Sequence, residues 1–569
     1  MELTPNELYH TVSEDYLSGL DADCPPPFFT VERELLAATN NAIEEWNLGP
    51  RDPSAPVGAP KKEAYPEQKP PSECLSKLKT LLPLQVALAI KYVHHAKLIC
   101  LSDREEDGNY EIGVYQTEGR LAGCYDIRRD NLRALIRRYN VTITKRGIDE
   151  VVTILRTECP RVMRCQDADL VPVKNGVYDY GSKLLLGFDP DFVFTTKIDV
   201  DYVDGARSPV IHNDEDGTDW DVASWMDSLS DDPETVRLLW QLLGAVIRPN
   251  VRWNKSAWLY STRGNNGKGT FCTLARNLCG PEACASIKLK DFGHNFMLEP
   301  LTRVSAIITD ENDTGTYLDD AAALKSIITG DPFQLNRKFK EPRTVLFKGF
   351  MVQCVNELPR LRDRSESMYR RLLVVPFEKR FEGNERKYIK DDYLKRKEVL
   401  EYVLYHLLAE TDYYELDEPQ ACTALLDEFR EVNDPVRQFL GDVLPEASWD
   451  ILSWQFVHDL YRHWFQRNIP SGRPESRKAL IADIKRLLPE WHEWSYTDNP
   501  VFVPDEMRAQ PEPLIAEYEV TEWMNKAYRG SDQGRVCMPD LPARVRGLVR
   551  TVPLGSGGSN ETDSEDKEE

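Results

Sequence analysis

The feature that most constrains the fold is a glycine-rich loop that follows a short apolar run at residues 257–260. The stretch from Ser261 to Thr270 reads Ser-Thr-Arg-Gly-Asn-Asn-Gly-Lys-Gly-Thr. A strand that leads through such a turn into a helix leaves successive backbone N–H groups unpaired at the positive end of the helix dipole. Glycines let this backbone approach an anion closely, and a lysine beside them adds a positive charge. The pattern therefore predicts an α/β fold with a phosphate-binding loop.

The candidate nucleotide-binding residues belong to the loop and to the start of the expected helix: Gly264, Asn265, Asn266, Gly267, Lys268, Gly269 and Thr270. The match to the phosphate-loop pattern G-x-x-x-x-G-K-[ST] is imperfect. Thr262 stands at the position of the first glycine, and Gly269 stands where a Mg²⁺-binding Ser or Thr is expected. Thr270, one place later, is therefore a candidate to bind Mg²⁺ in place of the expected Ser or Thr. Taken alone, the loop could also be an ordinary turn.

Two apolar runs farther along the chain end in polar side chains. Residues 305–309 lead into Asp310 and Glu311, and residues 347–355 lead into Asn356. Buried parallel strands that end in this way can supply an acid for Mg²⁺, a second acid that activates water, and an amide that orients the water. The loop lysine, Asp310 and Asn356 follow one another at separations of 42 and 46 residues. Each run alone could be a core strand capped by a turn, but together they indicate an ATPase site.

The three motifs resemble the A, B and C motifs of the superfamily three helicases, which replicate small DNA viruses, phages and plasmids. The closer likeness is to the phage and plasmid primase–helicase group related to the poxvirus NTPase, whose loop resembles Gly-Asn-Asn-Gly-Lys-Gly-Thr-Phe. Residues 324–331 are similar to the intermediate motif of this group, residues 368–377 to its arginine-finger segment, and residues 174–179 to the region before its helicase core. The resemblance covers residues from about 165 to 490. It implies an AAA+-like P-loop ATPase core.

The resemblance also implies a role for each motif residue. Lys268 and the loop amides would bind the β- and γ-phosphates of ATP, and Asp310, with Thr270, would hold Mg²⁺. Glu311 would act as the general base, and Asn356 would position the attacking water. The expected cofactors are therefore ATP and Mg²⁺.

A ring-shaped assembly is implied as well. Arg370 or Arg371 would neutralise γ-phosphate charge from the neighbouring subunit of a homo-oligomer, with a hexamer as the expected size. Residues 331–348 are expected to form a hairpin that projects into the central channel of such a ring. Its candidate DNA-binding residues are Arg337, Lys338, Phe339 and Lys340. Lysine pairs with phosphate and phenylalanine offers a stacking face, although a solvated hairpin is the alternative.

Bulk properties limit the class of protein. A chain of 569 residues is long enough for three or four domains. It has no stretch approaching 18 consecutive apolar residues and no visible secretory signal, so we expect a protein of the bacterial host cytoplasm without a membrane partner. Its 12 cysteines include no C-x-x-C motif, which favours reduced thiols and counts against a zinc-ribbon primase module. With a net charge of −23, DNA contacts would have to come from local basic patches.

The pattern along the chain suggests a series of segments. They are a helical segment at 1–49, a proline-rich linker at 50–71, an α+β domain at 72–165, a strand-rich region at 166–230, the ATPase core at 231–385, a helical extension at 386–430, a winged-helix-like DNA-binding domain at 431–553 and a disordered acidic tail at 554–569.

Several elements can be expected within these segments. Helices are expected at 31–46 and 84–96, a strand at 110–115, and a helix that starts at the acidic cap of residues 231–234 and ends before Pro249. Three further expectations are a basic helix within 128–146, a charged helix over 388–406, and a small β-wing over 491–503.

These observations favour an ATP-dependent replicative DNA helicase of a phage, plasmid or related mobile element. Its partners would be single-stranded or forked DNA, further copies of itself and other replication proteins. An origin-binding or loading protein that does not separate strands is one alternative, and the helicase part of a primase–helicase is another. No polymerase site is evident in residues 1–165. A small-molecule kinase would need neither Asn356 nor the basic hairpin.

Overall fold

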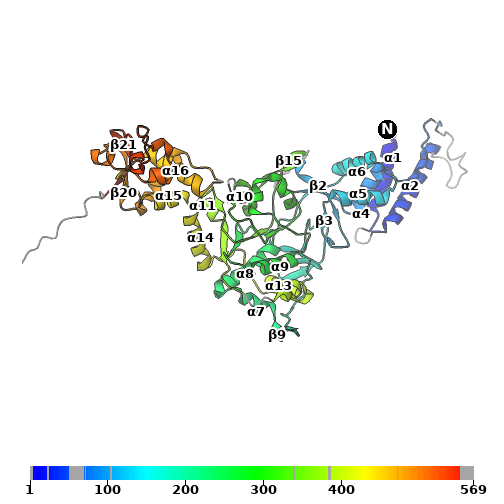
Figure 1. The fold of residues 1–569 in the computed structure, drawn as a ribbon. Coiled ribbons are helices and arrows are strands. Elements are labelled where there is room, and N and C mark those ends of the chain that lie inside the picture. The colour runs from blue at the N-terminus through cyan, green and yellow to red at the C-terminus, as the bar shows by residue number, and fades with distance from the viewer. Residues whose placement is uncertain are drawn as a thin grey trace, which may run out of the picture. The chain divides into compact units, whose positions relative to one another are not determined.

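The computed structural model describes residues 4–21, 25–49, 69–70, 72–102, 106–318, 321–337, 340–381, 386–470 and 472–551. These divide into two compact units (Figure 1). The first unit consists of Met1–Thr314, Ala321–Glu357 and Arg370–Thr423, and the second of Gly315–Asp320, Leu358–Tyr369 and Ala424–Glu569. Most of the expected linker and the whole expected acidic tail lie outside the described residues.

The N-terminal part of the first unit packs helices against one face of a small sheet. Its helices are α1 (Pro5–Ser18), α2 (Phe28–Leu48), α4 (Pro83–Val93), α5 (Arg129–Tyr139) and α6 (Lys145–Glu158). Its strands, in the order β3-β2-β1-β4, are β3 (Tyr125–Asp126), β2 (Tyr110–Tyr115), β1 (Lys97–Cys100) and β4 (Arg161–Met163). The helices predicted at 31–46 and 84–96 and the strand at 110–115 are confirmed.

The basic helix expected within 128–146 is present as α5 (Arg129–Tyr139), but it does not extend over the whole stretch. Helix α5 ends at Tyr139, and Asn140 accepts hydrogen bonds from the backbone and hydroxyl of Thr142 in the turn that follows. Thr144 then caps α6. At the start of the stretch, Arg128 is paired with the buried carboxylate of Asp126. Part of its positive charge therefore serves the fold.

A strand-rich region follows. Strands β5 (Leu170–Val173), β6 (Gly176–Asp179) and β7 (Leu184–Leu186) form an antiparallel sheet, and β8 (Ile211–Asn213) pairs with β9 (Thr218–Trp220). After α7 (Val222–Asp227), α8 (Pro233–Ile247) starts as predicted, because the Asp232 side chain accepts hydrogen bonds from the first-turn N–H groups of Glu234 and Thr235.

The centre of the first unit is a five-stranded parallel sheet in the order β11-β12-β16-β10-β18. The strands are β11 (Cys284–Ala285), β12 (Ala306–Thr309), β16 (Phe350–Val355), β10 (Ser256–Tyr260) and β18 (Leu372–Pro376). Strands β12 and β16 are buried throughout, which explains their continuous apolar sequences. Helices α8 and α9 (Lys268–Cys279) both contact β16. The protein is thus of mixed α/β class with a parallel sheet and many helices.

Between β12 and β16 the chain forms α10 (Ala322–Thr329) and an antiparallel hairpin of β14 (Phe333–Arg337) and β15 (Lys340–Val345). The hairpin predicted within 331–348 is therefore present. Its tip residues Lys338 and Phe339 lie outside the described residues, as do the side chains of Arg337 and Lys340.

The charged helix expected over 388–406 is broken. The chain forms α12 (Lys387–Asp391), a short 3-10 turn at Tyr393–Lys395 and α13 (Lys397–Ala409), followed by α14 (Gln420–Val432). Tyr393 and Leu394 are buried in the core of the first unit, and this inward turn interrupts the helix.

The second unit combines helices with an antiparallel sheet in the order β19-β21-β20. Its main elements are α15 (Pro435–Val443), β19 (Ile451–Ser453), α16 (Trp454–Asn468), α17 (Arg477–Leu487), β20 (Trp494–Phe502) and β21 (Arg544–Arg550). Short helices α18 (Asp505–Arg508), α19 (Leu514–Glu517) and α20 (Gln533–Val536) lie between the last two strands along the chain. The expected wing over 491–503 contributes only β20, because its partner strand comes from much farther along the chain.

Two short segments within residues 231–385, the predicted ATPase core, belong to the second unit. They carry β13 (Tyr317–Leu318), β17 (Arg360–Leu361) and α11 (Glu366–Tyr369). In the described part of the chain, none of the helices combines the length and apolar character needed to cross a membrane.

Candidate nucleotide-binding site

The glycine-rich loop connects β10 to α9, as its sequence predicts. Gly267 is the residue before the first turn of α9 and has φ +90°, in the left-handed region that favours glycine. A Cβ atom at this position would lie 2.7 Å from a methyl group of Leu229. Because Gly267 has no side chain to cap the helix, the N-terminal end of α9 keeps backbone donors suited to an anion.

Side chains and backbone groups hold the loop in shape. The Asn266 side-chain amide donates to the carbonyl of Arg263 at 2.6 Å, and the Phe381 N–H donates to the carbonyl of Asn265 at 2.9 Å. The Lys268 side chain is buried, and its ammonium donates to the Ser261 carbonyl at 3.3 Å. Burial lowers the pKa of Lys268. An anion bound here would offset that desolvation, since it would stabilise the charged form of the lysine.

The candidate metal residues come from two neighbouring elements. Thr270 is half-buried in the first turn of α9, and Asp310 directly follows β12. The Asp310 carboxylate is held by both terminal nitrogens of Arg276 from α9, at 2.5 and 2.8 Å. Arg276 is not among the site residues predicted from the sequence. Its only sequence signal is its place two helical turns after Lys268, on the helix that the loop begins.

The residues after Asp310 have different environments. Glu311 is exposed, whereas Asn312 is buried. The Asn312 amide donates to Gln353 at 3.0 Å and to the Cys354 carbonyl at 2.9 Å, and its oxygen accepts from the Leu289 N–H. Asn312 therefore connects the end of β12 to β16 by hydrogen bonds. Of Glu311 and Asn312, it is Glu311 whose side chain is exposed to solvent.

Asn356 directly follows β16 and is exposed. Strand β16 lies between β10 and β12, with Val355 beside Tyr260 and Gln353 beside Thr309. Because all three strands are parallel, the loop, the acid pair and Asn356 leave the sheet at the same edge. The structure thus brings these predicted residues together.

Arg370 and Arg371 are placed differently. They precede β18, and the Ser256 N–H donates to the Arg371 carbonyl at 2.8 Å, so both lie where β10 begins rather than where it ends. A five-residue strand spans roughly 16 Å, which separates them from the loop of the same chain. Arg370 is exposed and Arg371 is half-buried.

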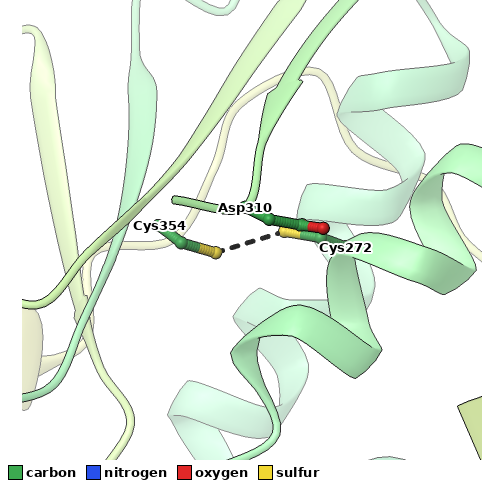
Figure 2. Close-up of side chains that lie close together, drawn as sticks. All are labelled: Cys272, Asp310 and Cys354. Atoms are coloured by element: carbon green, nitrogen blue, oxygen red, sulfur yellow. Dashed lines mark hydrogen bonds between the residues drawn. The ribbon is translucent and has the colours of Figure 1, made fainter. Parts of the chain in front are cut away.

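A pair of thiols lies beside Asp310 (Figure 2). The sulfur atoms of Cys272 on α9 and Cys354 on β16 are 3.4 Å apart, and together with a carboxylate oxygen of Asp310 they lie within 4.8 Å of one another. Such a set could hold a thiophilic metal. However, Arg276 already neutralises Asp310, and contact with Cys354 together with burial raises the pKa of the Cys272 thiol. The Cys272 thiol therefore fits best as a protonated group that packs against Cys354.

Two family models match parts of the chain. Residues 105–235 match the family described as D5 N terminal like, and residues 259–371 match a family of unknown function, DUF5906. The second match begins in β10 and ends at Arg371, so it contains the loop, the acid pair, Asn356 and both arginines. The search of curated proteins found no match.

Three similar solved structures are of the NrS-1 C terminal region. Each is an apo structure with a TM-score of 0.39. The first is 15% identical and covers 72% of this chain and 93% of the other; the second is 14% identical and covers 74% and 97%; the third is 14% identical and covers 72% and 94%. At this distance the likeness does not define the function of the chain.

Proposed function

We propose that this chain is an ATP-dependent replicative DNA helicase of a phage, plasmid or related mobile element. It would act as a ring-shaped homo-oligomer, and a hexamer is the expected size. One observation carries the proposal. The loop, the acid pair and Asn356 leave the same edge of three neighbouring parallel strands, with β16 between the loop strand and the acid strand. This strand order is the one found in AAA+ P-loop ATPases, and the D5 N terminal like match directly upstream is consistent with it.

The residues at this edge suit ATP and Mg²⁺. The start of α9, its buried Lys268 and the left-handed Gly267 provide the donors and the charge that β- and γ-phosphates need. Asp310 would hold Mg²⁺ while also paired with Arg276, which favours a link through water, and Thr270 could contribute its hydroxyl. The metal would supply charge neutralisation on the phosphates.

The exposed acid and amide beside the loop suit hydrolysis. Glu311 would accept a proton from the attacking water, a contribution that is typically about 10²–10⁴-fold in rate. Asn356, at the end of the strand between loop and acids, would hold that water in line with the γ-phosphate. Asn312 is bound to Gln353 and so cannot replace either group.

The placement of the two arginines favours action on a neighbouring subunit. They lie at the edge of the sheet where β10 begins, away from the loop of their own chain. Of the two, the exposed Arg370 is the better candidate for the finger that neutralises γ-phosphate charge, because Arg371 is half-buried. Fingers of this kind are worth on the order of 10³–10⁵ in rate.

The second unit supports a role in DNA binding. The chain order α15, β19, α16, α17, β20, β21 with the sheet order β19-β21-β20 is that of a winged helix. Of the basic residues on α17, Lys485 is paired with Asp498 and Arg486 with Asp434, whereas Arg477 and Lys478 are exposed. Arg477 and Lys478 are therefore the better candidates for phosphate contacts.

A groove of 720 Å³ in the second unit extends this basic surface. Three arginines line it, Arg477 from α17 and Arg544 and Arg546 from β21, together with Trp454. Among the described residues that line it, Asp498 is the one acid, and it pairs with Lys485. On a chain with a net charge of −23, such a local excess of positive charge suits the phosphates of DNA.

A strand-displacement assay on forked DNA with ATP and Mg²⁺ tests the proposal. The parent should separate the strands, and Lys268→Ala should not. ATP hydrolysis and DNA binding without strand separation would favour an origin-binding or loading protein. Primer synthesis on single-stranded DNA would instead favour a primase–helicase.

The hairpin offers a sharper test between helicase and loading protein. The double variant Lys338→Ala/Lys340→Ala should retain basal ATP hydrolysis but no longer separate strands, because neither residue is among those assigned to nucleotide chemistry. The slope of log affinity against log salt for single strands should fall by about 0.7 for each phosphate that the variant no longer binds. Unwinding by the double variant at the parental rate would remove the hairpin from the mechanism.

A further inference from the structure

Two segments that begin beside the proposed ATPase residues fold as part of the second unit. Residues 315–320 follow the acid pair within a few positions, and residues 358–369 occupy the interval between Asn356 and Arg370. They pair as the parallel strands β13 and β17. The proposed acids, the proposed water-positioning Asn356 and the proposed finger Arg370 are therefore each joined by the chain to a segment of the second unit, which carries the winged-helix elements.

A buried asparagine fixes the longer of these segments. The Asn433 oxygen accepts the Leu361 N–H at 2.7 Å, and its amide donates to the Leu361 carbonyl at 3.3 Å and to the Tyr369 hydroxyl at 2.9 Å. Asn433 is 5% exposed, so these hydrogen bonds replace the ones that the same groups would make to water. Tyr369, which is held in this way, directly precedes Arg370.

A single arginine ties the same segment to the helices of the second unit. Arg364 contacts three carboxylates: Asp434 at 2.7 Å, Glu475, and Asp483 at 3.6 Å. Asp434 caps α15, Glu475 immediately precedes the cap of α17, and Asp483 lies within α17. The Arg364 side chain is 18% exposed, so these ion pairs are shielded from solvent more than surface pairs are.

We infer that Arg364 and Asn433 are positioning residues of the ATPase: they fix the segment between Asn356 and Arg370 to the starts of α15 and α17, and so couple nucleotide hydrolysis to DNA binding by the second unit. The inference rests on the proposed function and adds a physical link to it. A shift of α17 on DNA would reach Arg364 through Glu475 and Asp483, and the finger through Tyr369. No residue of this link needs to touch nucleotide.

The test compares steady-state ATP hydrolysis of the parent, Arg364→Ala, Arg364→Lys and Arg473→Ala, with and without duplex and forked DNA. Arg473 lines the same groove as Arg364 and is exposed, so it is the matched control. Arg364→Ala should lower the DNA-stimulated kcat by about tenfold and change the KM for ATP by less than twofold, because the nucleotide pocket is unaltered. Arg364→Lys, which keeps a charge but not the fork, should recover only part of the activity. Arg473→Ala should match the parent.

If Arg364→Ala does not fold, the double variant Arg364→Gln/Glu475→Gln replaces it, because it removes one positive and one negative charge together. A parent that hydrolyses no ATP would overturn the proposed function and this inference with it. If DNA stimulates ATP hydrolysis equally in the parent and in a folded Arg364 variant, the inference is overturned and the proposed function is not.

Hydrogen exchange on the unaltered chain provides an independent measurement. Addition of a non-hydrolysable ATP analogue should change exchange at the loop and also at residues 315–320, 358–369 and 475–486. Changes in exchange that are confined to the loop and to the ends of β12 and β16 would show that nucleotide binding does not affect these segments. That result would overturn the coupling.

Discussion

Replacing Gly267 by alanine would test the geometry of the phosphate loop without altering any charge. At φ +90° a residue with a Cβ atom is strained by about 1–2 kcal/mol. The new methyl would also lie 2.7 Å from the buried side chain of Leu229, so that side chain must move as well. Gly264 in the same loop is a matched control, since a Cβ atom there meets nothing within 4 Å and its φ lies outside the left-handed region.

The strain can appear in two ways, and both can be measured. If the loop keeps its shape, the ligand-free protein is destabilised, and urea or thermal unfolding should show a decrease of about 1–2 kcal/mol in the free energy of unfolding. If the loop relaxes instead, stability is kept and ATP affinity falls by about 5–30-fold, since about 1.4 kcal/mol corresponds to a factor of ten. Gly264→Ala should leave the stability of the ligand-free protein unchanged.

Fluorescence titration with a labelled ATP analogue and thermal unfolding of the ligand-free protein together decide the matter. A Gly267→Ala protein with parental affinity and parental stability would refute the strained-loop geometry. Equal destabilisation by Gly264→Ala would show that the effect does not come from φ or from Leu229.

Three further outcomes are expected. Lys268→Ala should abolish nucleotide binding, whereas Glu311→Gln should bind ATP and turn it over at least about 10²-fold more slowly, as equilibrium binding and single-turnover hydrolysis would show; parental turnover by Glu311→Gln would remove it as the base. Arg370→Ala protein mixed into the parent should depress hydrolysis by more than simple dilution, whereas Arg371→Ala should do so less; strictly additive mixing would contradict a finger supplied between subunits. Burial raises the pKa of Glu512 to about 7 although backbone N–H groups donate to it; its neutral form therefore stabilises the second unit at low pH, and that contribution disappears as pH rises through about 7. Thermal unfolding between pH 5 and 8 should show this decrease in stability, Glu512→Gln should flatten the profile, and an equally steep profile in that variant would argue against Glu512.

Local sequence signals were sufficient to predict the elements that carry the candidate site. Apolar runs ending in Asp310 and Asn356 are adjacent parallel strands, and the glycine-rich loop does begin a helix. The roles of these residues stay predictions. The sequence could place them because each is adjacent in the chain to the strand that positions it, so that strand pairing alone brings them together.

Features that depend on distant parts of the chain could not be predicted in this way. The pairing of Arg276 with Asp310 requires that α9 cover the end of β12, which no local pattern encodes. Strand β20 finds its partner in β21, beyond three short helices. Residues 358–369 belong to the second unit, where Asn433 holds them by hydrogen bonds to Leu361. That the Asn433 amide is buried can be recognised only once the fold is known.

The second unit is assembled from three separate stretches of chain, and this has a consequence for its biosynthesis. A ribosome that makes the protein from the N-terminus completes β13 and β17 well before α15 and α17 exist. Until then, Arg364 has none of its three carboxylate partners, and the Leu361 amide lacks Asn433. The second unit can therefore reach its native state only after synthesis of the helices beyond residue 424, and a fragment that starts there would lack two of its strands. For the same reason, recombination between genes could not transfer the second unit as one continuous stretch of coding sequence.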